Sequence, residues 1–221
     1  MGIKVAQSNQ GIFLSQRKYT LDILEEAGLL GAKPAAFPME QNLKLNVNDD
    51  TALIDPSSYR RLVWHLIYLT ITRLDITFSV NILSQFMQTP RQPHMDAALH
   101  ILRYLTSSPG KGILLPSSNN FQLFGYSDSD WASCSTTHRS VTGLLSFSWR
   151  EPCIMVHKEQ STVSCSSAKA ECKAMATTTC KLVWLKPLLH DLGFAHLQPM
   201  HLYCDNQATL HIASNPVFHK P

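Results

Sequence analysis

The chain opens with two short runs in which apolar and polar residues alternate. These runs flank turn-forming residues at 8–11, so the segment 3–14 is expected to form a β-hairpin. Ser15 is the expected N-cap of a following helix, whose apolar positions recur every three to four residues. Gly28 is expected to end that helix. The pattern therefore predicts a hairpin followed by a helix.

Three further apolar stripes at helical spacing follow a stretch rich in proline, asparagine and aspartate at 31–56, which is expected to be a connecting loop. The stripes lie at 59–67, 76–87 and 97–105. Because each stripe gives its helix one apolar face, the three helices are expected to pack as a small bundle. Turn-forming and linker residues between 109 and 120 place a domain boundary at 116–120 and a first domain at 1–116.

The second half begins with strand patterns and continues with a long helix. The pattern predicts a first strand at 121–125 running into 126–131, strands at 141–149 and 153–156, a helix from Ser166 or Ser167, a strand at 200–204 and a helix at 207–214. Three successive strands favour an antiparallel meander, and the sheet becomes mixed if the fourth strand pairs beside the first. The order predicts an α+β domain at 121–221 with a helix-covered sheet.

Three carboxylates of this domain are candidates for a metal site. Asp128 lies at or just beyond the end of the first strand, Asp205 ends the fourth, and Glu171 heads the apolar stripe of the long helix. If the fourth strand pairs beside the first, all three meet at one edge of the sheet. Carboxylates so placed repel one another without a cation, and oxygen ligands suit Mg²⁺ or Mn²⁺. Such a site supports two-metal phosphodiester hydrolysis. The competing interpretation is that these acids are ordinary turn and capping residues.

Composition and charge narrow the class of protein. Hydrophobic residues make up 44% of the 221 residues and charged residues 16%, which is typical of a folded globular protein. The net charge of +3 is too small to indicate a nucleic-acid partner by itself. The sequence has no secretory signal and no apolar run of about 18 residues, so an intracellular protein without membrane contact is expected, with its six cysteines reduced.

Several motifs resemble the Pol polyproteins of copia-type retrotransposons. Those similar to the ribonuclease H region are YSDSDWAS at 126–133, HRSVTG at 138–143, SSAKAECKAMA at 166–176 and YCDNQAT at 203–209. Those similar to the C-terminal part of the reverse transcriptase are GIFLSQRKYTLDIL at 11–24, SYRRLVWHLIYLTITRLDITFSV at 58–80 and HILRYLTSSPGKGI at 100–113. The resemblance covers nearly the whole chain, with the motifs in the family's order.

This resemblance implies a fold and an activity. The first domain would be a helical thumb and connection-like region, and the second a ribonuclease H-like three-layer domain that hydrolyses the RNA strand of RNA–DNA hybrids. Asp128, Glu171 and Asp205 match the catalytic carboxylates of the family and would hold two Mg²⁺ or Mn²⁺ ions. The three residues singled out from their positions are therefore the ones that the family would use.

The resemblance also implies partners. Arginines on amphipathic helices more often form a solvated face, but in the family these helices lie along template and primer. Arg60, Arg61 and Arg103 are therefore expected to contact phosphates. The expected partners are an RNA–DNA hybrid or another nucleic acid and the remainder of a Pol polyprotein, in the cytoplasm or the nucleus.

The chain departs from the family in several places. It has no YxDD motif, so DNA polymerisation is not expected. Relatives continue past the position of Pro221 through a strand, a helix and a fourth acid, so the ribonuclease H fold is expected to be truncated. Lys169 and Cys172 stand where the family has an acid and a tyrosine. The alternative hypothesis is a degenerate, non-catalytic retroelement remnant with at most weak nucleic-acid binding.

Overall fold

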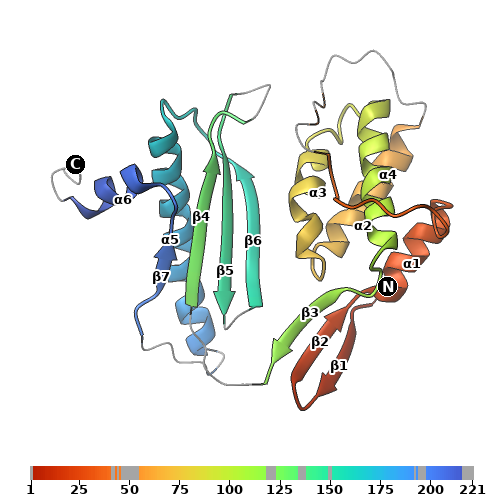
Figure 1. Cartoon of the computed structure of the whole chain (residues 1–221), viewed down its shortest axis with the longest axis horizontal. Helices are drawn as coiled ribbons and strands as arrows, with labels where there is room; N and C mark the ends of the chain where they lie inside the picture. Colours follow the sequence, from red (N-terminus) through yellow and green to blue (C-terminus); the bar gives the residue numbers. More distant parts are fainter. Residues whose placement is uncertain are drawn as a thin grey trace. The chain divides into compact units, whose positions relative to one another are not determined.

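The chain forms two compact units, Met1–Ser118 and Asn119–Pro221, in a computed structural model (Figure 1). The structure describes residues 2–40, 43, 45, 55–117, 123–133, 138–148, 151–191, 193 and 198–215. The division between the units falls inside the stretch 116–120. Each unit has its own sheet and its own helices, so each is described by itself.

The first unit contains an antiparallel sheet in the order β1-β2-β3. Its strands are β1 (Lys4–Ser8), β2 (Gly11–Ser15) and β3 (Gly112–Pro116). The hairpin predicted at 3–14 is confirmed as β1 and β2. The third strand corrects the interpretation of 109–120, where only turn and linker residues were expected. Gly112 pairs with Ser15, which lies far away in the sequence, and the periodicity of a five-residue segment does not reveal so distant a partner.

In its described residues the first unit also contains four α-helices and a 3-10 turn. They are α1 (Arg17–Glu26), α2 (Pro56–Leu69), the 3-10 turn η1 (Leu74–Ile76), α3 (Thr77–Ser84) and α4 (Gln92–Thr106). Ser15 is not the N-cap of α1, because it still belongs to β2; Gln16 takes the N-cap position, and its side chain makes no capping hydrogen bond to the helix. Gly28 follows the helix end with φ +68°, a left-handed conformation that glycine adopts without strain.

The predicted stripes of α2, α3 and α4 form the core of the first unit. Tyr59 on α2 is fully buried, and its hydroxyl donates to the carbonyl of Leu83 on α3 at 2.7 Å. Leu66, Ile101 and Leu105 are likewise 0% exposed. Burying an aliphatic side chain of this size contributes about 2 kcal/mol, so the apolar stripe of each helix accounts for its docking in the bundle.

The second unit has a mixed four-stranded sheet in the order β6-β5-β4-β7. Its elements are β4 (Leu123–Asp130), β5 (Val141–Ser148), β6 (Glu151–Glu159), α5 (Ser167–Asp191), β7 (His201–Tyr203) and α6 (Gln207–Ser214). The predicted meander is confirmed, because β4, β5 and β6 pair antiparallel, and β7 pairs parallel with β4. The predicted α+β class is confirmed as well.

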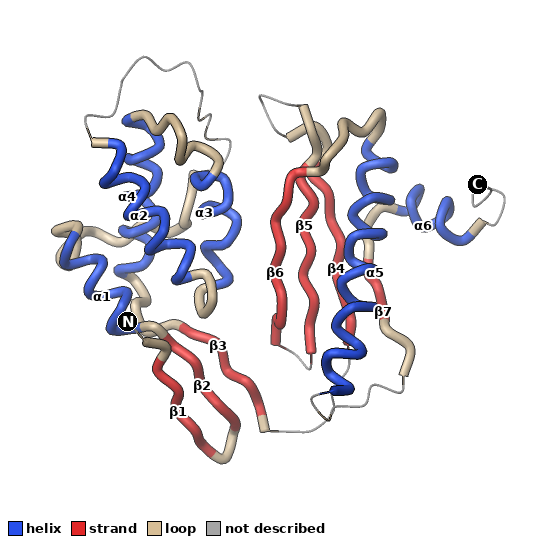
Figure 2. The backbone as a smooth tube through the Cα atoms, turned by 180° about the vertical axis from the view of Figure 1, so that it is seen from behind, coloured by secondary structure: helices blue, strands red, loops and turns tan. Residues whose placement is uncertain are grey.

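Helix α5 packs on β4 and β5 and also contacts β7 (Figure 2). Leu123 of β4 and Leu182 and Leu185 of α5 form a small buried cluster. Gly125 lets the helix approach closely, because a Cβ at this position would lie 2.9 Å from Cγ2 of Thr178. The helix that carries Glu171 is therefore held directly on the strand that carries Asp128. Within the described residues, no helix has both the length and the hydropathy that crossing a membrane requires.

Candidate metal centre

Equivalent positions along two parallel strands bring Asp128 and Asp205 to the same edge of the sheet. The expectation that Asp128 ends its strand is corrected, because β4 continues to Asp130. In the β4–β7 ladder, Tyr126 pairs with Tyr203. Asp128 lies two residues beyond Tyr126, and Asp205 lies two residues beyond Tyr203, just after β7 ends. Parallel strands carry equivalent positions to the same edge. The pairing on which the predicted site depended is therefore present.

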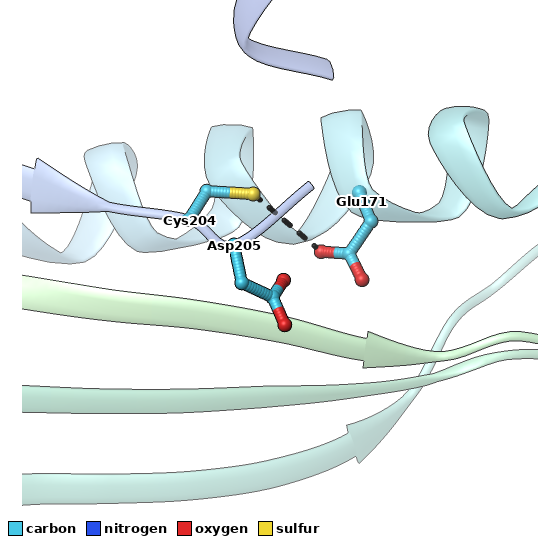
Figure 3. Close-up of side chains that lie close together, drawn as sticks. All are labelled: Glu171, Cys204 and Asp205. Carbon is cyan, nitrogen blue, oxygen red and sulfur yellow. Dashed lines mark hydrogen bonds between the residues drawn. The ribbon is translucent and has the colours of Figure 1, made fainter. Parts of the chain in front are cut away.

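Glu171 lies in the first turns of α5 and is buried, with 5% of its surface exposed. Its Oε1 accepts a hydrogen bond from the backbone N–H of Ser129 at 3.0 Å. The same N–H lies 2.8 Å from Oδ1 of Asp128. On its other side, the thiol of Cys204 donates to Oε2 of Glu171 at 3.9 Å. Figure 3 shows Glu171 beside Cys204 and Asp205, so the long helix contributes its carboxylate to the end of the sheet.

Three side chains offer metal ligands in one place. One ligand atom each of Glu171, Cys204 and Asp205 lies within 4.8 Å of the other two. Asp128 is outside this group, and it is linked to Glu171 through the shared Ser129 N–H. The structure thus brings two of the three expected carboxylates together and adds Cys204, for which the sequence predicts only a reduced thiol. Its position directly before Asp205 was the available signal.

The direction of the Asp128 side chain follows from the pleat of β4. Ser127 and Ser129 are buried, whereas Asp128 and Asp130 are exposed. Successive side chains of a strand point to opposite faces, so Asp128 leaves the strand on the other side from its serine neighbours. Its link to the centre is the N–H of Ser129, which lies within hydrogen-bond distance of both Asp128 Oδ1 and Glu171 Oε1.

The electrostatics of the centre favour a bound cation. Burial raises the pKa of Glu171, and the charges of Asp128 and Asp205 raise it further, although the Ser129 N–H and the Cys204 thiol oppose this change. Burial also raises the pKa of the Cys204 thiol, as does the charge of Glu171. The centre thus concentrates negative charge that water solvates incompletely, and a divalent cation would relieve that repulsion.

The ligand set fits a divalent cation. The carboxylate oxygens of Glu171 and Asp205 are the ligands that Mg²⁺ and Mn²⁺ prefer. The Cys204 thiol is a softer ligand, and it would bind Zn²⁺ or Cd²⁺ in preference to Mg²⁺. Because Glu171 is held by a backbone N–H, one oxygen ligand is positioned before any ion arrives.

The arginines expected at nucleic acid lie on the helices of the first unit. Arg60 donates from Nε to the carbonyl of Met87 at 2.8 Å. Arg61 forms an ion pair with Glu26, with 3.1 Å between Nε and Oε1. Arg103 is exposed in the last turn of α4. Two of the three guanidinium groups therefore already have partners within the unit.

Comparison with known proteins gives close relatives over almost the whole chain. The sequence is 40% identical over 219 residues to the retrovirus-related Pol polyprotein from transposon RE2 of Arabidopsis thaliana, and 30% identical over 234 residues to that from transposon TNT 1-94 of Nicotiana tabacum. Each match covers 99% of this chain but only 15% and 17% of the two relatives, so the chain spans a small part of their length.

A shorter relative is covered more completely. An uncharacterized mitochondrial protein of Arabidopsis thaliana is 39% identical over 185 residues, which are 83% of this chain and 76% of that protein. No protein-family model matches the sequence, and no solved structure matches it. The sequence is nevertheless 30–40% identical to several transposon polyproteins over almost its whole length. The chain therefore belongs to the family of copia-type retrotransposon Pol polyproteins.

Proposed function

We propose that the second unit is a ribonuclease H-like nuclease domain that hydrolyses the RNA strand of RNA–DNA hybrids. The observation that carries this proposal is the convergence of the buried Glu171 with Asp205 beside the parallel pair of β4 and β7. Asp128 shares the Ser129 amide with Glu171 and supplies a third carboxylate at the same edge. Kinship with Pol polyproteins supports the same conclusion.

Asp128, Glu171 and Asp205 would hold two Mg²⁺ or Mn²⁺ ions in this proposal. Such ions supply an activated water and stabilise the leaving 3′ oxygen when a phosphodiester is hydrolysed. Glu171 would be a preoriented ligand, because the Ser129 N–H holds its carboxylate. Asp205 is exposed and would face the substrate. Asp128, whose Oδ1 lies 2.8 Å from the Ser129 N–H, would supply the third carboxylate from β4.

Nucleic acid is the proposed partner of both units. The hybrid would be recognised by its shape and by its 2′ hydroxyl groups, because the chemistry depends on no base. Arg103 is exposed in the last turn of α4 and could contact a phosphate directly. Arg60 and Arg61 would first have to release their present partners. These are the carbonyl of Met87 for Arg60 and the carboxylate of Glu26 for Arg61. The remainder of a Pol polyprotein is the second proposed partner, in the cytoplasm or nucleus.

Cleavage of a labelled RNA–DNA hybrid tests the proposal. The full chain is incubated with the hybrid and Mg²⁺, and products with 3′ hydroxyl and 5′ phosphate ends are expected. Asp205→Asn and Glu171→Gln should each reduce the rate by at least a hundredfold. Asp191→Asn, which changes an exposed acid at the far end of α5, should keep the wild-type rate. Activity that survives in Asp205→Asn would contradict the assignment of the site.

A second candidate function is that of a non-catalytic remnant with weak nucleic-acid binding. It is favoured by the position of Asp128 outside the group formed by the ligand atoms of Glu171, Cys204 and Asp205. Metal-dependent catalysis tolerates little misplacement of its ligands. This candidate predicts that the chain binds the hybrid in a mobility-shift assay but leaves it intact in Mg²⁺ and in Mn²⁺, and that Asp205→Asn binds equally well.

A further inference from the structure

A buried polar side chain, Gln160, lies between the sheet and the first turns of α5. It follows β6 directly and is 8% exposed. Its Nε2 lies 2.9 Å from the carbonyl of Ala170 on α5, 3.1 Å from the hydroxyl of Thr142 on β5 and 3.3 Å from the hydroxyl of Ser129 on β4. One amide group thus contacts the helix and two neighbouring strands.

The other end of the Gln160 amide is also fixed. Its Oε1 accepts from the hydroxyl of Ser164 at 3.0 Å. That hydroxyl accepts from Nζ of Lys173 on α5 at 3.0 Å, and the carbonyl of Ser164 accepts from Nε1 of Trp131 at 2.9 Å. Both ends of the amide have partners, so the Gln160 side chain has a defined orientation instead of a choice of two.

Two of these partners adjoin the atoms that hold Glu171. Ser129, whose hydroxyl contacts Gln160, is the residue whose N–H donates to Oε1 of Glu171. Ala170, whose carbonyl accepts from Gln160, directly precedes Glu171 on α5. Gln160 therefore holds a residue on each side of the hydrogen bond between Ser129 and Glu171, through the Ser129 hydroxyl and the Ala170 carbonyl.

We propose that Gln160 is a positioning residue of the candidate metal centre: its side-chain amide sets the contact between the Ser129 N–H and the Glu171 carboxylate. The part of this inference that concerns metal rests on the proposed function, and the part that concerns the contact does not. The competing role is that of an ordinary buried polar residue. Loss of such a residue loosens the whole unit evenly, whereas loss of a positioning residue loosens one contact selectively.

Amide hydrogen exchange of the full chain tests the contact without metal. In Gln160→Met, which keeps the length of the side chain but lacks the amide, the Ser129 N–H should exchange at least tenfold faster than in the wild type. The amides of 123–127 in the same strand serve as internal reference and should change less than twofold. A folded Gln160→Met variant with unchanged Ser129 exchange, or with equal acceleration along all of β4, would overturn the proposal.

A milder variant keeps the test decisive if Gln160→Met does not fold. Thr142→Val removes one hydrogen-bond acceptor of Gln160 at nearly constant volume. It should accelerate Ser129 exchange about threefold relative to the same reference amides, and an unchanged rate contradicts the proposal.

Mn²⁺ titration tests the part of the proposal that concerns metal, and Gln160→Met should bind Mn²⁺ about tenfold more weakly than the wild type. A wild-type chain that binds no Mn²⁺ contradicts the proposed function, while the exchange data still decide the role of Gln160.

Discussion

Arg73 and Asp75 form a two-point ion pair inside the first unit, and the Arg73 side chain is only 1% exposed. Nε of Arg73 lies 3.0 Å from Oδ1 of Asp75, and Nη2 lies 2.9 Å from Oδ2. Tyr104 on α4 donates its hydroxyl to Oδ2 at 2.8 Å, and Nη1 of Arg73 donates to the carbonyl of Ser108 at 2.9 Å. The pair therefore joins η1 to α4 and to the turn that leads into β3.

Asp75→Asn should destabilise the first unit by about 3 kcal/mol, because it leaves the buried Arg73 guanidinium without a countercharge. Urea denaturation followed by far-ultraviolet circular dichroism measures the change. Asp96→Asn is the matched control, since Asp96 is an exposed acid on α4 whose contact is a single hydrogen bond from Gln92. A loss below 1 kcal/mol for Asp75→Asn would show that the pair contributes little.

The same ion pair should make stability depend on pH between 4 and 2. Burial alone would raise the pKa of Asp75, but the hydrogen bonds and charge of Arg73, with Tyr104 and Lys111, outweigh it and lower the pKa from 3.8 to about 2. The ionised carboxylate is thus favoured by folding, and its contribution is complete above pH 4 and lost as the pH falls through 2. We expect about 2 kcal/mol to disappear over this range. The unfolding free energies of the wild type and of Asp75→Asn should approach each other as the pH falls from 4 to 2. Parallel curves over this range would contradict the lowered pKa of Asp75.

The helices and the meander could be predicted because their signal is local. Apolar positions three and four residues apart identify α2 and α4 without knowledge of any partner. On α5, hydrophobicity favours Met175 over Ala174 as a buried residue, but Ala174 is fully buried and Met175 is not. The helix approaches Gly125 through Thr178 and Leu182, and hydrophobicity alone does not rank alanine above methionine. The pairing of β3 with β2 is invisible for a different reason, since it depends on a distant segment.

The candidate site was only partly predictable. Glu171 and Asp205 could be placed because a helical stripe and a strand end fix them in space. The direction of Asp128 could not be placed, because it alternates with Ser127 and Ser129 in a run of polar residues, and the pattern does not distinguish the two faces of such a strand. Cys204 belongs to the group of ligand atoms because of the way the backbone runs after β7. The identity of the residue alone does not predict that backbone path.

Cys204→Ser should separate soft from hard cations. The thiol lies with Glu171 and Asp205 in one group of ligand atoms, and sulfur binds Cd²⁺ far better than a hydroxyl does, whereas Mg²⁺ and Mn²⁺ prefer oxygen. We expect the variant to bind Cd²⁺ at least tenfold more weakly at pH 7 and to bind Mn²⁺ within twofold of the wild type. Isothermal titration calorimetry measures both affinities, with Cys180→Ser, an exposed cysteine elsewhere on α5, as the control. Equal Cd²⁺ affinity in Cys204→Ser and the wild type would remove the thiol from the site.

Glu171→Gln should stabilise the second unit in the absence of divalent cations. Burial, together with Asp128 and Asp205, raises the pKa of Glu171, so the folded state disfavours the ionised carboxylate and the wild type loses stability as the pH rises above about 4.5. Glutamine is neutral and keeps an oxygen for the Ser129 N–H. In chelator at pH 7 the variant should therefore unfold at a higher temperature than the wild type, and the difference should vanish below pH 4.

Divalent cations should reverse this order, because an ion that binds only the folded state stabilises it in proportion to the logarithm of its concentration. Millimolar Mg²⁺ or Mn²⁺ should raise the unfolding temperature of the wild type and leave that of Glu171→Gln unchanged. A wild-type transition that ignores both ions, or a variant less stable than the wild type in chelator, would mean that Glu171 is an ordinary core acid. The reversal requires both a strained carboxylate and an ion that relieves the strain, so a purely structural glutamate cannot produce it.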